Sequence, residues 1–482
     1  MFSLNARLGI IFFTALLARI VYFHFTGFVN DDAFITFRYA ENLAHGLGFV
    51  YNAGQPVLGT SSPLFTLILA CLAIVGFKIP SAALAISLIA SGLTAAVIYR
   101  FAWHLRFTLF AWLPTIAYIL WPRSLTADTA GMETALFTLL VTAAFYYEAK
   151  QLRFYSLGVA TLSALTRPEG YLVLGILLLI NLYREPRFWK QQLSVVGLLL
   201  LPWLIFATIY FGSPIPNTVL AKAQLLDKLG HFSIWETVRY FMAWHSPFGW
   251  LMTLMAIPGG YWLNKKQNFG WPAIIFLVGL IGFYAFTSAR MFFWYVTPIY
   301  PLYFIFALAS LCWVADRFGW VKQHRELVRN LGLIALIILF CYAWITPVDY
   351  YARLQESQLK AQYEVGTYLS AKASADALVA AEDIGYIGFY SGKRILDRDG
   401  LVSPEVIPYN RTRNYLGLIT DFQPDWVVTL RGSRLSGFYN QQEFTKQYRL
   451  ATSYESERVS YDIFRHVIPD STQSIENLQP QK

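Results

Sequence analysis

The chain has 482 residues, of which 56% are hydrophobic, 17% are aromatic and only 14% are charged. Soluble domains average about 45–50% apolar and about 25% charged residues, so this composition excludes an ordinary soluble enzyme and a disordered chain. The formal net charge is +9, but the basic residues lie in short segments between apolar runs, as in the cytoplasmic loops of membrane proteins. We therefore expect a chain that lies mostly in a lipid bilayer and has no nucleic-acid partner.

Apolar runs that are long enough to cross a bilayer recur as far as Pro347. The run over 63–77 is treated as a half-buried helix on the outer face, because the strongly basic turns then all fall on one side of the membrane. This topology predicts a cytoplasmic N-terminus and an extracytoplasmic segment after Pro347. We predict eleven membrane-spanning helices, over residues 8–28, 81–101, 107–122, 133–148, 153–167, 170–184, 192–211, 248–264, 271–288, 293–314 and 330–347.

After Pro347, polar and charged residues become more frequent and the apolar runs shorten to the length of strands. A helical pattern covers 359–372, and strands are predicted over 377–381, 394–397, 426–430 and 461–465. The predicted fold is an α-helical polytopic membrane protein with a small C-terminal extracytoplasmic α/β domain. We expect a transmembrane domain over 1–347 with a first outer loop over 29–80, the α/β domain over 348–468, and a disordered polar tail over 469–482.

Two adjacent carboxylates, Asp31 and Asp32, follow directly on the first predicted membrane helix. Charged groups at the rim of the hydrocarbon are costly and by default indicate function. A carboxylate there can deprotonate an acceptor hydroxyl, and a pair can hold a divalent cation beside a phosphate. The structural alternative is a helix N-cap in favourable contact with the helix dipole. The next segment is amphipathic, so we expect Phe34 and Phe37 to lie on lipid and Arg38 to face water.

Polar residues in the later outer loops allow both a functional and a structural interpretation. Glu133 opens a membrane helix, where an acid also stabilises the helix dipole. Arg167 lies in a tight outer turn, against the charge bias of that side. It either binds a phosphate or forms an ion pair with a nearby acid such as Glu169.

Two more cations lie in outer segments. Lys222 either meets a phosphate or is a solvated loop lysine. Arg290 is followed by Trp294 and Tyr295, a pattern that suits a sugar phosphate or an aromatic belt at the membrane interface. The sequence contains neither a Walker A motif nor a Gly-x-Ser-x-Gly elbow, so a lipid-carried substrate is the natural energy source.

Three stretches of the first outer loop carry a resemblance to a known family: 31–40 (DDAFITFRYA), 48–52 (GFVYN) and 59–64 (GTSSPL). They resemble bacterial GT-C glycosyltransferases, in particular the terminal arabinofuranosyltransferases of mycobacterial cell walls. More distantly, the chain resembles the protein O-mannosyltransferases and lipid A aminoarabinose transferases. Weaker similarity continues through 167–170, 217–222 and 381–392, and through Asp397 and 400–401.

The resemblance implies an inverting enzyme that takes a sugar from a polyprenyl phosphate at the outer face of a bacterial inner membrane. The acceptor would be a cell-envelope glycan, glycolipid or protein. Asp31 is the favoured catalytic base with Asp32 as its partner, and Glu133 is a second acid. The paired aspartates permit a divalent metal, Mg²⁺ or Mn²⁺, without requiring one. Residues 381–401 form an acceptor surface or are purely structural.

The resemblance also assigns residues to the substrates. The candidate ligands of the donor phosphate are Arg38, Arg167, Lys222 and Arg290. The candidate contacts of the sugar or acceptor are Tyr51, Asn52, Thr60, Ser61, Asn217 and Tyr295.

Two other functions compete with this one. A transporter or flippase of lipid-linked sugars would need polar residues across the bilayer midplane and often internal repeats, whereas the charges here lie at the outer rim and the sequence has no repeat. A non-catalytic glycan-binding membrane partner could keep the same scaffold, and only activity measurements separate it from an enzyme.

Overall fold

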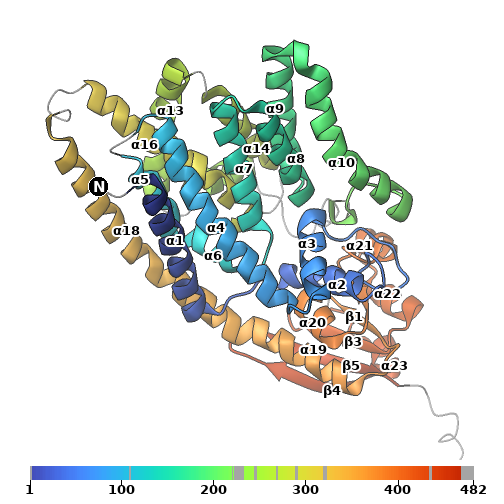
Figure 1. Ribbon diagram of the computed structural model, residues 1–482. Helices are drawn as coiled ribbons and strands as arrows, with labels where there is room; N and C mark the ends of the chain where they lie inside the picture. The colour runs from blue at the N-terminus through green and yellow to red at the C-terminus, as the bar shows by residue number, and fades with distance from the viewer. Residues whose placement is uncertain are drawn as a thin grey trace, which may run out of the picture.

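The computed structural model describes residues 3–107, 110–219, 221, 233–243, 247–267, 270–287, 291–317, 323–433 and 437–467. Most of these residues are helical, and a small sheet lies near the end of the chain (Figure 1). The small C-terminal sheet domain predicted from the sequence is therefore present.

The first part of the chain is a bundle of helices. Its elements are α1 (Leu4–Thr26), α2 (Asp31–Ala44), α3 (Pro63–Ile74), α4 (Ile79–His104), α5 (Trp112–Leu120), α6 (Pro122–Thr129), α7 (Thr134–Ala149), α8 (Arg153–Thr166), α9 (Gly170–Arg184), η1 (Pro186–Phe188) and α10 (Trp189–Phe211). They continue with α12 (Ile234–Ala243), α13 (Pro247–Gln267), α14 (Gly270–Thr287), α15 (Phe293–Val296), η2 (Thr297–Ile299), α16 (Tyr300–Arg317) and α18 (Arg325–Leu354).

Length and composition suit several of these helices to a membrane. Five described helical runs are long and apolar enough to cross one, or six if α6 and α7, which meet at a bend of 118°, form one broken span. Large apolar side chains on α10 are open to the surroundings, with Leu198 77% and Ile209 80% exposed. Such a face is stable against lipid and costly against water.

The predicted number of eleven spans is not confirmed. Each predicted span contains a helix, but the one over 107–122 holds only the nine residues of α5. Nine residues rise about 13 Å, whereas the hydrocarbon core is about 30 Å thick. This segment therefore does not cross a bilayer by itself.

The C-terminal domain follows α18 without a break in the helix. A π-helical turn, η3 (Gln355–Leu359), joins α18 to α19 (Lys360–Lys372). The other elements are β1 (Leu378–Ala381), α20 (Ile384–Ser391), β2 (Arg394–Asp397), η4 (Pro404–Val406), α21 (Ile407–Thr412), α22 (Tyr415–Phe422), β3 (Trp426–Leu430), α23 (Gln442–Gln447), β4 (Tyr448–Glu455) and β5 (Ser460–His466).

The strand order in the sheet is β2-β1-β3-β5-β4. Strand β1 pairs in parallel with β2 and β3, and β5 pairs antiparallel with β3 and β4. All four predicted strands are found, and β4 was missed. Strand β4 lies at the edge of the sheet, and three successive residues after Tyr448 are exposed. Its sequence therefore lacks the apolar run that marks a central strand, and local patterns do not predict it.

The first outer loop and the C-terminal domain share a hydrophobic core. Ile35, Tyr39 and Tyr51 of the loop pack with Val365 of α19 and Val379 of β1. Figure 1 shows α2 lying against the sheet domain, below the bundle of helices.

The expectation that α2 lies on lipid is therefore wrong. Phe34 is 2% exposed and Phe37 is fully buried. Phe34 stacks on Tyr386 of α20, with ring centroids 4.0 Å apart. Arg38, expected in water, is buried too. The apolar face of α2 meets a protein domain, which sequence periodicity cannot distinguish from lipid.

Candidate active site

The two aspartates at the start of α2 have different environments. Asn30 is the N-cap of α2, and its side chain accepts a hydrogen bond from the Asp32 amide at 3.2 Å. The Asp31 carboxylate points instead to the start of α20, where it accepts hydrogen bonds from the amides of Gly385 (3.2 Å) and Tyr386 (2.7 Å). Asp31 therefore supplies the acceptor that the first turn of α20 needs.

The Asp31 carboxyl is also a buried acid among other acids. Burial, followed by the charge of Asp383, raises its pKa to about 8, while the amides of Tyr386 and Gly385 oppose the shift. The Asp383 carboxyl accepts a hydrogen bond from the Tyr461 hydroxyl. Burial likewise raises the pKa of Asp383, to about 6.

Arg38 binds the opposite end of α20. Its guanidinium donates to the carbonyl oxygens of Gly388 and Lys393, both at 2.5 Å, and its Nε donates to Tyr51 O at 2.8 Å. It also lies over the Tyr51 ring, 4.3 Å from the centroid. With this set of bonds Arg38 holds the C-terminal domain on α2, and each of its three nitrogens donates to a backbone carbonyl oxygen.

Three more of the predicted substrate residues contact the C-terminal domain. The Tyr51 hydroxyl donates to Ile384 O at 2.6 Å. The Asn52 amide accepts from Ile395 N at 3.0 Å and donates to Ile395 O at 2.8 Å, so it pairs with the edge strand β2. The Asn217 amide donates to Gly400 O and Leu401 O at 2.8 and 2.9 Å.

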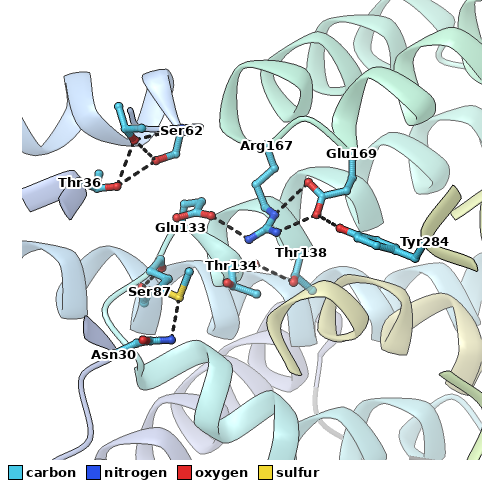
Figure 2. Close-up of polar contacts among 12 residues, drawn as sticks. Asn30, Thr36, Ser62, Ser87, Glu133, Thr134, Thr138, Arg167, Glu169 and Tyr284 are labelled. Atoms are coloured by element: carbon cyan, nitrogen blue, oxygen red, sulfur yellow. Dashed lines mark hydrogen bonds and ion pairs between the residues drawn. The ribbon is translucent and has the colours of Figure 1, made fainter. Parts of the chain in front are cut away.

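The other two predicted substrate contacts in the first loop, Thr60 and Ser61, differ in their exposure. Thr60 is buried in a hydroxyl cluster with Thr36 (3.2 Å) and Ser62 (3.2 Å). Figure 2 labels Thr36 and Ser62 of this cluster. Ser61 is partly exposed and lines two cavities. Thr60 lines the second of these cavities as well, so the loop presents both residues to open space.

Asp32 is the carboxylate that the fold leaves available. Within the described part of the chain, no hydrogen bond or ion pair is formed by its side-chain oxygens. Its charge acts on Glu133 on one side and on Asp383 on the other. It thus lies between the loop, the start of α7 and the C-terminal domain.

Glu133, Arg167 and Glu169 form a buried ionic cluster at the ends of α7, α8 and α9. Arg167 donates to Glu133 at 2.8 Å and to both oxygens of Glu169, at 2.7 and 3.2 Å. The Tyr284 hydroxyl donates to Glu169 at 2.6 Å. Figure 2 shows Arg167 between the two glutamates, with Tyr284 beyond Glu169. The alternative of an ion pair between Arg167 and Glu169 is thus found.

Two cavities adjoin this cluster. The first, of about 360 Å³, is lined by Arg167, Glu169, Tyr284 and Tyr295 together with apolar side chains. The Tyr295 ring stacks on Tyr284 at 4.9 Å and lies 5.6 Å from the Arg167 guanidinium. The second, of about 310 Å³, is lined mainly by apolar residues and shares Ser61 with the first. Together they offer an ionic end and an apolar end, as an amphiphilic substrate needs.

Some assignments have no structural support here. Lys222 and Arg290 lie outside the described residues. Among the residues that are described, no group of three or more His, Cys, Asp or Glu side chains is arranged to hold a metal ion. The Asp31 oxygens accept bonds from two amides, and a divalent metal at Asp31 and Asp32 stays a prediction.

Sequence reasoning missed two groups that the fold adds. Tyr284 lies in a long apolar run, where nothing marks it as a partner of Glu169. Asp383 lies in a stretch noted only for its resemblance, and its approach to Asp31 joins positions more than 350 residues apart. No local pattern reports such a contact.

Comparison with known proteins gives a consistent result. A family model described as a domain of unknown function (DUF8728) matches residues 350–472. The chain is 28% identical over 265 residues to the terminal beta-(1->2)-arabinofuranosyltransferase of Mycobacterium tuberculosis. That match covers 50% of this chain and 41% of the relative's length.

The fold is similar to that of ArnT from Cupriavidus metallidurans, in crystal structures bound to undecaprenyl phosphate and in the apo state. Both have a TM-score of 0.60, with 12% and 14% identity. The alignments cover 96% and 95% of this chain and 98% of each ArnT chain. The chain therefore has an ArnT-like fold, and its likeness to GT-C membrane glycosyltransferases, expected from the first outer loop, is confirmed.

Proposed function

We propose that this protein is an inverting membrane glycosyltransferase that moves a sugar from a polyprenyl phosphate to a cell-envelope glycan, glycolipid or protein. The reaction would take place at the extracytoplasmic face of a bacterial inner membrane. The observation that carries the proposal is Asp32, a carboxylate without an internal partner among the described residues. It is held beside Glu133 and the ionic cluster on an ArnT-like fold.

Asp32, rather than Asp31, is the base in this proposal. Asp31 is occupied by the amides of α20, whereas the oxygens of Asp32 can accept a proton from an acceptor hydroxyl. As the acceptor oxygen bonds to the anomeric carbon, the bond from that carbon to the phosphate oxygen breaks. The electron pair leaves with the polyprenyl phosphate, and the hydroxyl proton passes to Asp32.

The two neighbouring cavities, which share lining residues such as Ser61 and Tyr171, would hold the lipid-linked donor. The ionic end at Arg167 and Tyr295 suits a polar head, and the apolar end suits a hydrocarbon chain. Arg167 already balances two carboxylates, so it orients Glu133 more than it neutralises a phosphate. Lys222 and Arg290 are the further cations that would stabilise the negative charge of the leaving phosphate.

The test is sugar transfer by the purified full-length protein in nanodiscs, with a panel of polyprenyl-phosphate sugars and bacterial envelope extract. Asp32→Asn should lower the rate by about 10²–10⁴-fold, with thermal unfolding unchanged. Asp376→Asn, at an exposed position of the C-terminal domain, is the matched control. Full transfer by Asp32→Asn would refute the role of Asp32, and no transfer or binding of any lipid-linked sugar by the wild type would refute the function.

A further inference from the structure

Arg123 is a cation inside the helical bundle that the proposed reaction does not use. It lies in the first turn of α6, which contacts α1, α4, α18 and η2 (Figure 1). Every other residue of α6 is buried, whereas Arg123 is partly accessible.

Three of the four buried arginines in the described residues have a carboxylate partner, and the fourth, Arg38, donates to backbone carbonyl oxygens instead. Three guanidinium groups lie within ion-pair distance of an acid: Arg19 with Asp128 at 2.9 Å, Arg167 with Glu133 at 2.8 Å, and Arg398 with Glu382 at 3.7 Å. This is the usual arrangement, because a buried charge is costly unless it is paired.

Arg123 departs from this pattern. Across the described ranges it forms no ion pair with an acid, and its Nη1 is buried without a hydrogen-bond partner. Its neighbours are tyrosines: the Tyr240 ring lies 4.9 Å from the guanidinium, the hydroxyls of Tyr240 and Tyr300 lie within hydrogen-bonding reach of it, and Tyr351 acts on it electrostatically. Because a guanidinium does not lose its proton in proteins, the charge remains, and no described acid lies within ion-pair distance of it.

A second donor lies beside it. Ser124, the next residue of α6, is fully buried, and its Oγ has no hydrogen-bond partner in the part of the chain that the structure describes. The first turn of a helix also carries unpaired amides and a positive partial charge. The start of α6 thus has several hydrogen-bond donors and a positive charge. Among the described residues, no carboxylate forms an ion pair or hydrogen bond with Arg123 or Ser124.

We propose that Arg123 binds the phosphate of a membrane lipid, at a site separate from the candidate catalytic carboxylates. A guanidinium fork matches phosphate oxygens, and tyrosine rings suit the boundary between a polar head and apolar chains. The site is at the opposite end of α6 from Ala130, whose carbonyl oxygen bonds Asn30 beside the two aspartates. This inference does not rest on the proposed transferase activity.

The first test measures lipid binding by the full-length protein in detergent, with undecaprenyl phosphate and phosphatidylglycerol as separate probes. Arg123→Gln should weaken the binding of one of them by about ten-fold or more. Arg100→Gln, which removes the same charge from an exposed position on α4, should leave both unchanged. Loss for undecaprenyl phosphate identifies an isoprenoid phosphate site, and loss for phosphatidylglycerol identifies a phospholipid site.

A second measurement uses the wild-type protein and so does not depend on the variant folding. Phenylglyoxal modifies accessible arginines, and peptide mass spectrometry reports each site. The bound lipid should protect Arg123 and leave Arg100 reactive. Wild-type affinity of Arg123→Gln for both lipids, or modification of Arg123 that neither lipid slows, would overturn the proposal. Sugar transfer plays no part in either readout, so failure here leaves the proposed function standing.

Discussion

Asp31 and Arg38 lie two helical turns apart on α2 and bind opposite ends of the same helix, α20. Asp31 accepts from the amides of the first turn, and Arg38 donates to carbonyls at and beyond its last turn. Acceptor oxygens at the start of a helix satisfy its unpaired amides, and a positive group at its end interacts favourably with the helix dipole. The first outer loop therefore holds the C-terminal domain through two residues that the resemblance suggested as a catalytic base and a phosphate ligand.

Removal of the Arg38 charge should loosen the C-terminal domain. In Arg38→Gln the carbonyls of Gly388 and Lys393 lose their donors in a buried place, and charged hydrogen bonds contribute about 1.5–3 kcal/mol each. We expect the opening free energy of α20 to fall by about 2–4 kcal/mol, as measured by amide hydrogen exchange. Affinity for a lipid-linked donor should change little.

Arg394→Gln is the matched control, because Arg394 is exposed on strand β2 of the same domain. Amide hydrogen exchange of α20 in Arg394→Gln should match that of the wild type. A large loss of donor affinity in Arg38→Gln with α20 still protected would instead make Arg38 a phosphate ligand.

The contact between α2 and α20 also depends on glycine. A Cβ at Gly385 would overlap the backbone of Asp31, and one at Gly388 would overlap the Tyr51 hydroxyl. Gly385→Ala should therefore push α20 away from α2 and lower the midpoint of thermal unfolding. Gly437→Ala, at a position of the same domain with open space around it, should not. Equal midpoints of thermal unfolding for Gly385→Ala and Gly437→Ala would show that α2 and α20 do not pack as closely as described here.

The sequence predicted the elements of this protein better than their contacts. Four strands and the helix over 359–372 follow from local apolar patterns, which report burial within one element. The same patterns could not report that Asp31 meets Gly385, 354 residues later in the chain. They also misplaced Phe34 on lipid, because a protein interface and a bilayer both favour apolar side chains. The first-loop motif was rightly singled out, but much of it serves to dock a domain.

Substitutions in the ionic cluster should distinguish a catalytic acid, Glu133, from a structural one, Glu169. Glu169 binds Arg167 through both oxygens, while Glu133 does so through one. Glu133→Gln should therefore lower kcat by about 10²-fold or more and barely change thermal unfolding. Glu169→Gln should mainly destabilise the protein, by about 3–5 kcal/mol, because Arg167 loses its principal partner.

These two variants are each other's controls, since both remove one charge from the same cluster. The measurements are transfer kinetics and thermal unfolding of each. Equal loss of stability with equal loss of rate would show that both glutamates act only through Arg167.

The docking of α20 should weaken as the pH rises. Burial and the charge of Asp383 raise the pKa of Asp31 to about 8, from 3.8 for the free group. The folded protein therefore binds more protons than the unfolded chain between these values. The contribution of Asp31 to stability is full below about pH 4 and is lost as the pH passes through about 8. Protection of the α20 amides, corrected for intrinsic exchange rates, should fall over this range.

Asp31→Asn should remove the upper part of this pH dependence, because its amide has no proton to lose and its oxygen can still accept from the α20 amides. A smaller slope should remain near pH 6, where burial places the pKa of Asp383. Asp376→Asn, at an exposed position of the same domain, should keep the full wild-type slope. If Asp31→Asn kept it as well, the titrating group would lie elsewhere in the buried acids, with Asp399, whose pKa burial also raises to about 8, as the next to change.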